Sequence, residues 1–245
     1  MKNKEIIFIV DFNNRFSSKW ASKPYRSGMD KNLLKAEFKK KDYDISFITY
    51  QEINFRNKPY FKNKVFFYTS SEDKNLFYKS YVEDIVLGLE LVGADVVPPF
   101  RYLRAHHNKT FMEILRDVFD LEGVKDVVSM YYGTYEDFKL EVDKLEYPLV
   151  LKSAFGATGK TVALAKTKKE ALRKARRFSS SRNFFYDLRD FLRGLKHTGY
   201  IKQSKNRRKF IAQNFIPHMD RDYKILIFDK KYFFVGNGNS NNCRG

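Results

Sequence analysis

The first hundred residues alternate between short apolar runs and amphipathic segments, and this order restricts the possible folds more than any other feature of the sequence. Four runs are rich in Ile, Val, Phe and Tyr and have the length of buried strands; they are residues 6–10, 45–50, 65–69 and 94–97. Residues 30–43 and 74–92 instead repeat apolar side chains every three or four positions, which predicts helices. Strands that alternate with helices usually pair in parallel. We therefore expect an α/β domain with a parallel sheet over residues 1–103.

A different order begins in the second part of the chain. Asn108 is placed to cap a helix over 109–119, and a strand near 127–132 and a helix near 135–145 follow. After Pro148, two short apolar strands, 149–152 and 161–165, flank a segment of small residues, which is typical of an antiparallel hairpin with a glycine loop. Further helices and strands are predicted at 168–178, 183–196, 210–216, 223–228 and 232–235. We expect residues 104–235 to form a second, α+β region and the polar residues 236–245 to be a disordered tail.

The net charge of +18 is concentrated in the last part of the chain. Residues 148–245 carry 23 basic and 6 acidic side chains. Positive charge concentrated in one region indicates either that the region binds an anion or that an acidic part that would balance it is missing. Cys243, the single cysteine, excludes an internal disulfide framework, and the 24 Phe and 16 Tyr exclude a wholly disordered chain. The apolar run 6–10 is too short for a signal peptide or a membrane span, so we expect a cytoplasmic protein.

The segment between the two hairpin strands invites comparison with a phosphate-binding P-loop, but its spacing differs. A P-loop needs a glycine at position 154, where this chain has Ala154, and it leads into a helix rather than into a strand. An ordinary hairpin turn is the simplest alternative. Lys152, however, ends an otherwise apolar strand, where an ammonium group is costly without an anionic partner. A lysine beside a glycine loop is therefore a candidate phosphate site.

These residues together resemble the ATP-grasp family. Pro148-Leu-Val-Leu-Lys152, the loop with two glycines and the returning strand resemble the nucleotide-binding hairpin of that family. Residues 210–216 and 219–228 resemble the element that passes the adenine and ribose, and 104–109 resembles the entry segment that carries a phosphate-binding lysine. The alternating first domain resembles the pre-ATP-grasp domain. The whole pattern is most similar to stand-alone ATP-grasp ligases linked to surface-polysaccharide biosynthesis.

The resemblance implies ATP as the cofactor and a set of nucleotide contacts. Lys109 and Lys152 would hold the α- and β-phosphates, and backbone N–H groups of the loop would cover them. Residues 213–216 would line the adenine, Asp222 would bind the ribose hydroxyls, and Lys224 could lie near the γ-phosphate. The loop and adenine residues implied are Ser153, Gly156, Ala157, Thr158, Gly159, Lys160, Gln213, Asn214, Phe215 and Ile216. Asn214 stands where the family usually has Glu.

The resemblance also implies a reaction, in which ATP activates a carboxylate as an acyl-phosphate that an amine or similar nucleophile then attacks. The family uses magnesium for this, held by acidic or Asn side chains of later strands. After Asp222 the sequence offers one further acid, Asp229, so neither metal ligands nor catalytic residues are assigned. We therefore expect an incomplete ATP-grasp domain, truncated before its metal-binding strands, that is inactive or partly active by itself.

Two other interpretations remain open. The Lys- and Arg-rich segment 166–209 could neutralise nucleic-acid phosphates, although basic helix faces exposed to solvent explain it with fewer assumptions. Alternatively, the chain could be an inert remnant that folds only in its first 150 residues.

Overall fold

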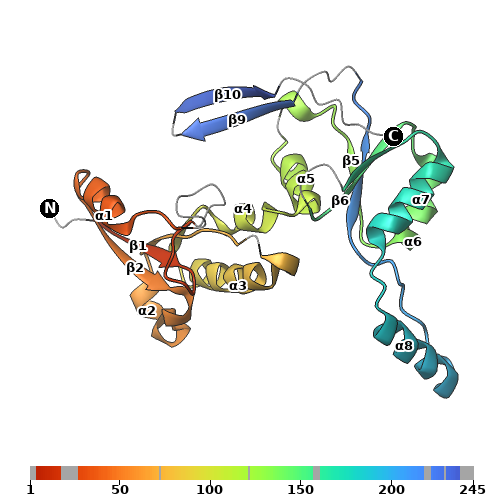
Figure 1. The fold of residues 1–245 in the computed structure, drawn as a ribbon, viewed down its shortest axis with the longest axis horizontal. Coiled ribbons are helices and arrows are strands. Elements are labelled where there is room, and N and C mark those ends of the chain that lie inside the picture. Colours follow the sequence, from red (N-terminus) through yellow and green to blue (C-terminus); the bar gives the residue numbers. More distant parts are fainter. Residues whose placement is uncertain are drawn as a thin grey trace. The chain divides into compact units, whose positions relative to one another are not determined.

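The computed structural model describes residues 4–17, 27–71, 73–120, 122–156, 161–217, 222–228 and 230–237. The chain forms two compact units, Met1–His106 and His107–Gly245 (Figure 1).

The first unit is built on a parallel sheet, as the alternating pattern predicts. Its strands have the order β2-β1-β3-β4, and each neighbouring pair is parallel. They are β1 (Lys4–Val10), β2 (Tyr43–Thr49), β3 (Val65–Phe67) and β4 (Asp95–Val97). The helices are α1 (Lys31–Lys39), α2 (Lys58–Phe61), α3 (Phe77–Leu91) and α4 (Phe100–Ala105), with short 3-10 turns at Tyr50–Glu52, Phe55–Asn57 and Lys74–Leu76.

Strand β1 is buried on both faces, because helices cover both sides of the sheet. Ile7 and Ile9 pack with Val82, Val86 and Leu89 of α3. On the opposite face, Ile6, Phe8 and Val10 of β1 pack with α1 and neighbouring aromatic rings. This arrangement explains why residues 6–10 are continuously apolar.

The predicted helix over 74–92 was too long. Asn75 and Leu76 have positive φ angles of 64° and 58°, so the backbone turns left-handed before α3 begins. The carboxylate of Asp73 accepts hydrogen bonds from the N–H groups of Tyr78 and Lys79, both at 3.0 Å. The carboxylate of Asp73 thus accepts from N–H groups that have no partner within α3, and the helix begins at Phe77.

The second unit contains an antiparallel sheet of order β5-β8-β6-β7. Its strands are β5 (Ser129–Tyr132), β6 (Leu149–Ser153), β7 (Val162–Ala165) and β8 (Phe210–Asn214). The helices are α5 (Lys109–Val118), α6 (Tyr135–Glu141), α7 (Lys168–Ser179) and α8 (Phe184–Lys196), with 3-10 turns at Glu122–Val124 and Val142–Lys144. Strands β6 and β7 pair with each other, which confirms the predicted hairpin.

Helices α6 and α7 cover one face of this sheet. The core of the second unit lies between these helices and the sheet. Phe138 of α6 and Ala171, Ala175 and Phe178 of α7 pack against Phe210 in the centre of the sheet. The cations of α7 at positions 169, 173, 176 and 177 are exposed, as expected of a solvated helix face.

A separate two-stranded hairpin follows the sheet. Strands β9 (Asp222–Phe228) and β10 (Lys231–Asn237) pair antiparallel in Figure 1. The predicted disordered tail therefore begins too early, because Gly236 and Asn237 pair with Tyr223 and Asp222 at the end of β10. Residues 238–245, the rest of that tail, lie outside the described residues.

Candidate functional site

The register of the sheet places Lys152 and Gln213 on the same face, opposite the α6–α7 core. Lys152 of β6 pairs with Ile211 of β8, and Gln213 pairs with Val150 two positions away. The Nζ atom of Lys152 donates a hydrogen bond to Oε1 of Gln213 at 2.6 Å. In this structure the partner of the half-buried lysine is therefore a neutral amide.

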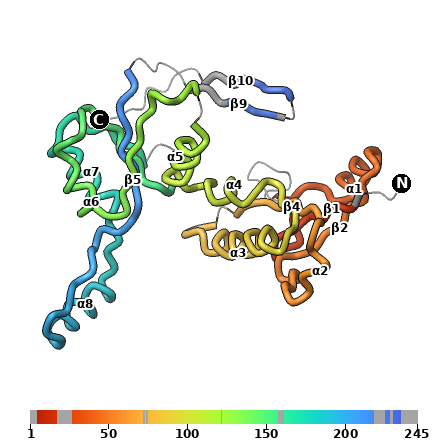
Figure 2. Tube along the Cα trace, turned by 180° about the vertical axis from the view of Figure 1, so that it is seen from behind, coloured from red at the N-terminus to blue at the C-terminus, as the bar shows by residue number. Residues whose placement is uncertain are grey.

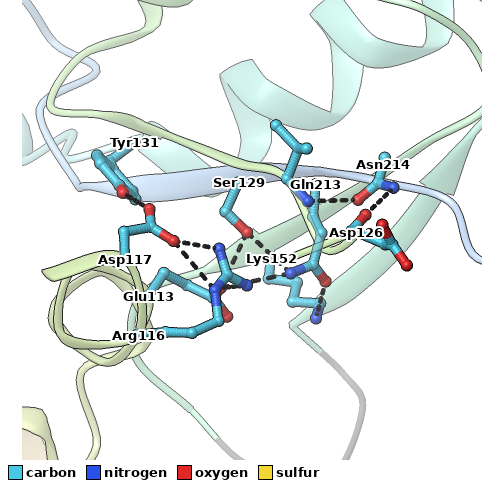
Figure 3. A network of polar contacts seen from close by, with 10 residues as sticks. Glu113, Arg116, Asp117, Asp126, Ser129, Tyr131, Lys152, Gln213 and Asn214 are labelled. Carbon is cyan, nitrogen blue, oxygen red and sulfur yellow. Dashed lines mark hydrogen bonds and ion pairs between the residues drawn. The ribbon is translucent and has the colours of Figure 1, made fainter. Parts of the chain in front are cut away.

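A network of polar side chains holds Gln213 from the other side (Figure 3). Its Nε2 atom donates to Ser129 Oγ at 2.8 Å and to Glu113 Oε2 at 3.4 Å, and Ser129 Oγ donates to the same Glu113 oxygen at 2.9 Å. Arg116 forms an ion pair with Glu113 and a second with Asp117. These α5 residues were not among the predicted site residues, although an acid and a base three positions apart on a helix, as Glu113 and Arg116 are, form a recognisable signal.

Lys109 reaches the hairpin through the start of α5. Asn108 caps the helix, as predicted, since its Oδ1 atom accepts from the N–H of Phe111 at 3.3 Å. The backbone N–H of Lys109 donates to the carbonyl of Ala154 at 2.9 Å, and its ammonium donates to the carbonyl of Gly156. The backbone and the side chain of Lys109 are thus both hydrogen-bonded to the segment that follows β6.

Both lysines have a lowered pKa, and Lys152 contributes to the change at Lys109. Burial lowers the pKa of Lys109, and the nearby ammonium of Lys152 lowers it further. Burial also lowers the pKa of Lys152, and Glu113 opposes this change. Two partly buried cations that repel each other form a site that an anion would stabilise.

The glycine loop is constrained at its first glycine. Gly156 has a φ angle of +107°, and a Cβ atom there would lie 2.7 Å from Cγ2 of Thr161. The N–H of Ser153 donates to the carbonyl of Thr161 at 2.9 Å, which closes the hairpin next to the loop. The other predicted loop residues, Ala157, Thr158, Gly159 and Lys160, lie outside the described residues.

At the end of β8 the predicted adenine residues divide into two groups. The side chains of Gln213 and Asn214 both form hydrogen bonds within the protein. That of Asn214 accepts from the N–H of Val128 at 2.9 Å and donates to the carbonyl of Asp126 at 2.8 Å. Phe215 and Ile216 follow the strand with 41% and 37% of their surfaces exposed, which leaves them accessible to a ligand. Asp222 and Lys224 belong to β9, and the structure does not describe their side chains.

No group of three or more His, Cys, Asp or Glu side chains among the described residues is placed to hold a metal ion. No helix in the described part of the chain is long and apolar enough to cross a membrane.

Comparison by sequence finds a ligase. No family model matches the chain. A stretch of 134 residues is 28% identical to the alanine–anticapsin ligase of Bacillus subtilis (strain 168), and the match covers 44% of this chain and 28% of that protein. The chain thus matches less than a third of this curated relative's length.

Comparison by structure finds an ATP-grasp protein, a synthetase and a ligase at low sequence identity. A RimK domain ATP-grasp protein from Sphaerobacter thermophilus is 14% identical with a TM-score of 0.42, over 88% of this chain and 65% of that one. The ADP complex of N5-carboxyaminoimidazole ribonucleotide synthetase is 14% identical with a TM-score of 0.49, over 99% and 56%. The D-alanine–D-alanine ligase of Bacillus anthracis is 16% identical with a TM-score of 0.43, over 96% and 71%. The chain is thus similar to proteins that are ligases or synthetases, and to one RimK domain ATP-grasp protein.

Proposed function

We propose that the second unit binds ATP at the β6–β7 hairpin. The observation that carries this proposal is the pair Lys109 and Lys152, two partly buried cations next to the hairpin; burial lowers the pKa of both, and Lys152 lowers the pKa of Lys109 further. The phosphates of a nucleotide would supply the missing anion, and backbone N–H groups of a glycine loop are suited to bind them. The network of Glu113, Ser129 and Gln213 would orient Lys152 toward this ligand.

The proposed contacts follow the chain from the loop to β9. Lys109 and Lys152 would bind the α- and β-phosphates, with the loop from Ser153 to Lys160 above them. Phe215 and Ile216 would lie against the adenine, while Asp222 would bind the ribose and Lys224 the γ-phosphate. Because the amides of Gln213 and Asn214 already have partners within the protein, they support this site rather than contact the adenine.

The proposed reaction class is ATP-dependent ligation of a carboxylate to an amine. The carboxylate oxygen attacks the γ-phosphorus of ATP, which forms an acyl-phosphate and releases ADP, and the amine then displaces phosphate at the acyl carbon. The lysine pair would bind and orient the phosphates in the first step. No step is assigned to magnesium, and the partial activity and the link to polysaccharide biosynthesis remain predictions from the resemblance.

Isothermal titration calorimetry with ATP and with ADP tests the binding proposal. Lys109→Met and Lys152→Met should each weaken nucleotide binding about tenfold to hundredfold, since hydrogen bonds to charged groups contribute about 1.5–3 kcal/mol. Lys169→Met removes an exposed lysine of α7 and serves as the matched control with unchanged affinity. Wild-type protein that binds neither nucleotide at millimolar concentration would overturn the proposal, and so would equal losses in all three variants.

A further inference from the structure

Residues 180–209 form an arm that carries α8 away from the antiparallel sheet, as both views of the molecule show (Figures 1 and 2). Hydrogen bonds between the two sides of the arm hold its base. The N–H of Ser181 donates to the carbonyl of Lys205, and the N–H of Arg208 donates to the carbonyl of Ser179, both at 2.9 Å. These hydrogen bonds fix the base of the arm that carries α8.

One face of α8 is covered by the returning segment of the arm. The hydroxyl of Tyr200 donates to the carboxylate of Asp190, which is only 5% exposed. Asp187 lies 3.9 Å from the ammonium of Lys205, and a Cβ atom on Gly194 would meet the Lys202 side chain at 2.9 Å. Asp187 and Asp190, the two acids of α8, thus lie on the face covered by the returning segment.

A second face of α8 is apolar and exposed. Its six large side chains, together called the α8 stripe, are between 46% and 80% exposed. They are Phe184, Phe185, Leu188, Phe191, Leu192 and Leu195. At about 100° per residue they occupy an arc of about 120°. Since globular proteins usually bury such a helix face, the α8 stripe has the form of a contact surface for a partner.

Cations border the α8 stripe on both sides. Arg189, Arg193 and Lys196 follow it around the helix, and the guanidinium of Arg189 lies 5.0 Å from the ring centre of Tyr186. From the returning segment, the ammonium of Lys202 lies 5.2 Å from the ring centre of Phe191. The α8 stripe is apolar and bordered by cations, and the two acids of α8 lie on another face of the helix. Such a face complements a partner that has an anionic outer layer over an apolar interior.

From this arrangement we infer that the α8 stripe docks on an anionic lipid membrane surface. The helix lies in the headgroup region with Phe and Leu side chains inserted, and the bordering cations contact lipid phosphates. A second copy of this chain is a poorer occupant, because pairing two stripes would bring two sets of like-charged arginines and lysines together. The inference is independent of the proposed nucleotide site.

Sedimentation with lipid vesicles tests the inference on the full chain. Binding is measured to vesicles of phosphatidylcholine alone and to vesicles that contain about one third phosphatidylglycerol. Leu195→Glu should weaken binding to the anionic vesicles about tenfold to hundredfold, because a large apolar side chain leaves the lipid. The matched control is Leu140→Glu on α6, where an 81% exposed leucine outside the stripe should be replaceable without effect. Circular dichroism verifies that both variants fold.

A second variant separates charge from apolar insertion. Arg189→Gln combined with Lys196→Gln should reduce binding to anionic vesicles about fivefold per cation and leave binding to neutral vesicles unchanged. Wild-type protein that stays in solution with anionic vesicles would overturn the inference, as would equal binding by Leu195→Glu and Leu140→Glu. A dimer in sedimentation equilibrium that Leu195→Glu dissociates would instead assign the α8 stripe to a second copy.

Discussion

Replacing Gly156 with alanine tests how the β6–β7 hairpin is built. Two costs follow from the structure. A residue with a side chain at a left-handed φ such as +107° is destabilised by about 1–2 kcal/mol. The new Cβ atom would also lie 2.7 Å from Cγ2 of Thr161, and overpacking of this kind costs about 1–3 kcal/mol. Gly156→Ala should therefore destabilise the hairpin by about 2–5 kcal/mol in total.

Thr161→Ser separates the two costs, because it removes Cγ2 and retains the hydroxyl 3.2 Å from the new Cβ atom. In this background Gly156→Ala should lose most of the overpacking cost of about 1–3 kcal/mol, since only the 3.2 Å contact with the hydroxyl is left, and keep the cost of the φ angle. Hydrogen exchange of the β6 and β7 amides, measured by mass spectrometry at several urea concentrations, reports the local free energy of opening.

The matched control is Gly133→Ala in the same unit, where the nearest atom to a new Cβ is Asp137 Oδ2 at 3.8 Å. This variant should leave the exchange of the hairpin amides unchanged. The reasoning is refuted if Gly156→Ala costs less than about 0.5 kcal/mol, or if Thr161→Ser does not reduce its cost.

Three further substitutions test other parts of the two units. Burial alone would raise the pKa of Asp73, but hydrogen bonds from the N–H groups at the start of α3 outweigh it and lower that pKa below 3.8. Its carboxylate therefore stabilises the first unit above about pH 4, this contribution disappears as the pH falls through the lowered value, and Asp73→Asn should flatten the urea midpoint between pH 4 and pH 2. Asp30→Ala removes the cap that accepts from Asn32 and Leu33 of α1, and should cost about 1 kcal/mol in urea titrations. Phe138→Ala removes a fully buried ring packed against Tyr132 and Phe210, and should lower the stability of the second unit by about 3–5 kcal/mol, measured by hydrogen exchange of β8.

Features governed by neighbours in the sequence were predictable. The continuous apolar run of β1 indicated a buried strand, and the cap at Asn108 marked the start of α5. Lys152 was recognisable because an ammonium group at the end of an apolar strand needs a partner. The break before α3 was not predicted, because apolar periodicity continues through Asn75 and Leu76 while their backbone is left-handed.

Features governed by strand register were not predictable from the sequence. Gln213 was expected to line the adenine, but its amide is a hydrogen-bond partner of Lys152, which lies 61 positions earlier in the chain. Asn214 likewise holds the segment at Asp126 and Val128. Such pairings depend on which residues of β5 and β6 stand opposite those of β8, and periodicity within a single strand does not contain that information.

The strand order of the antiparallel sheet has a consequence for how the chain folds during synthesis. Strand β8 lies between β5 and β6, yet it is made last, so neither of its neighbours has this partner until residues 210–214 leave the ribosome. The parallel sheet, by contrast, is complete once β4 has been made at residue 97. The nascent chain therefore carries a finished first unit and an open β6–β7 hairpin while more than forty residues, including α7 and α8, emerge between β7 and β8. During that interval the unpaired edge of β6 is where a chaperone or a neighbouring nascent chain would bind.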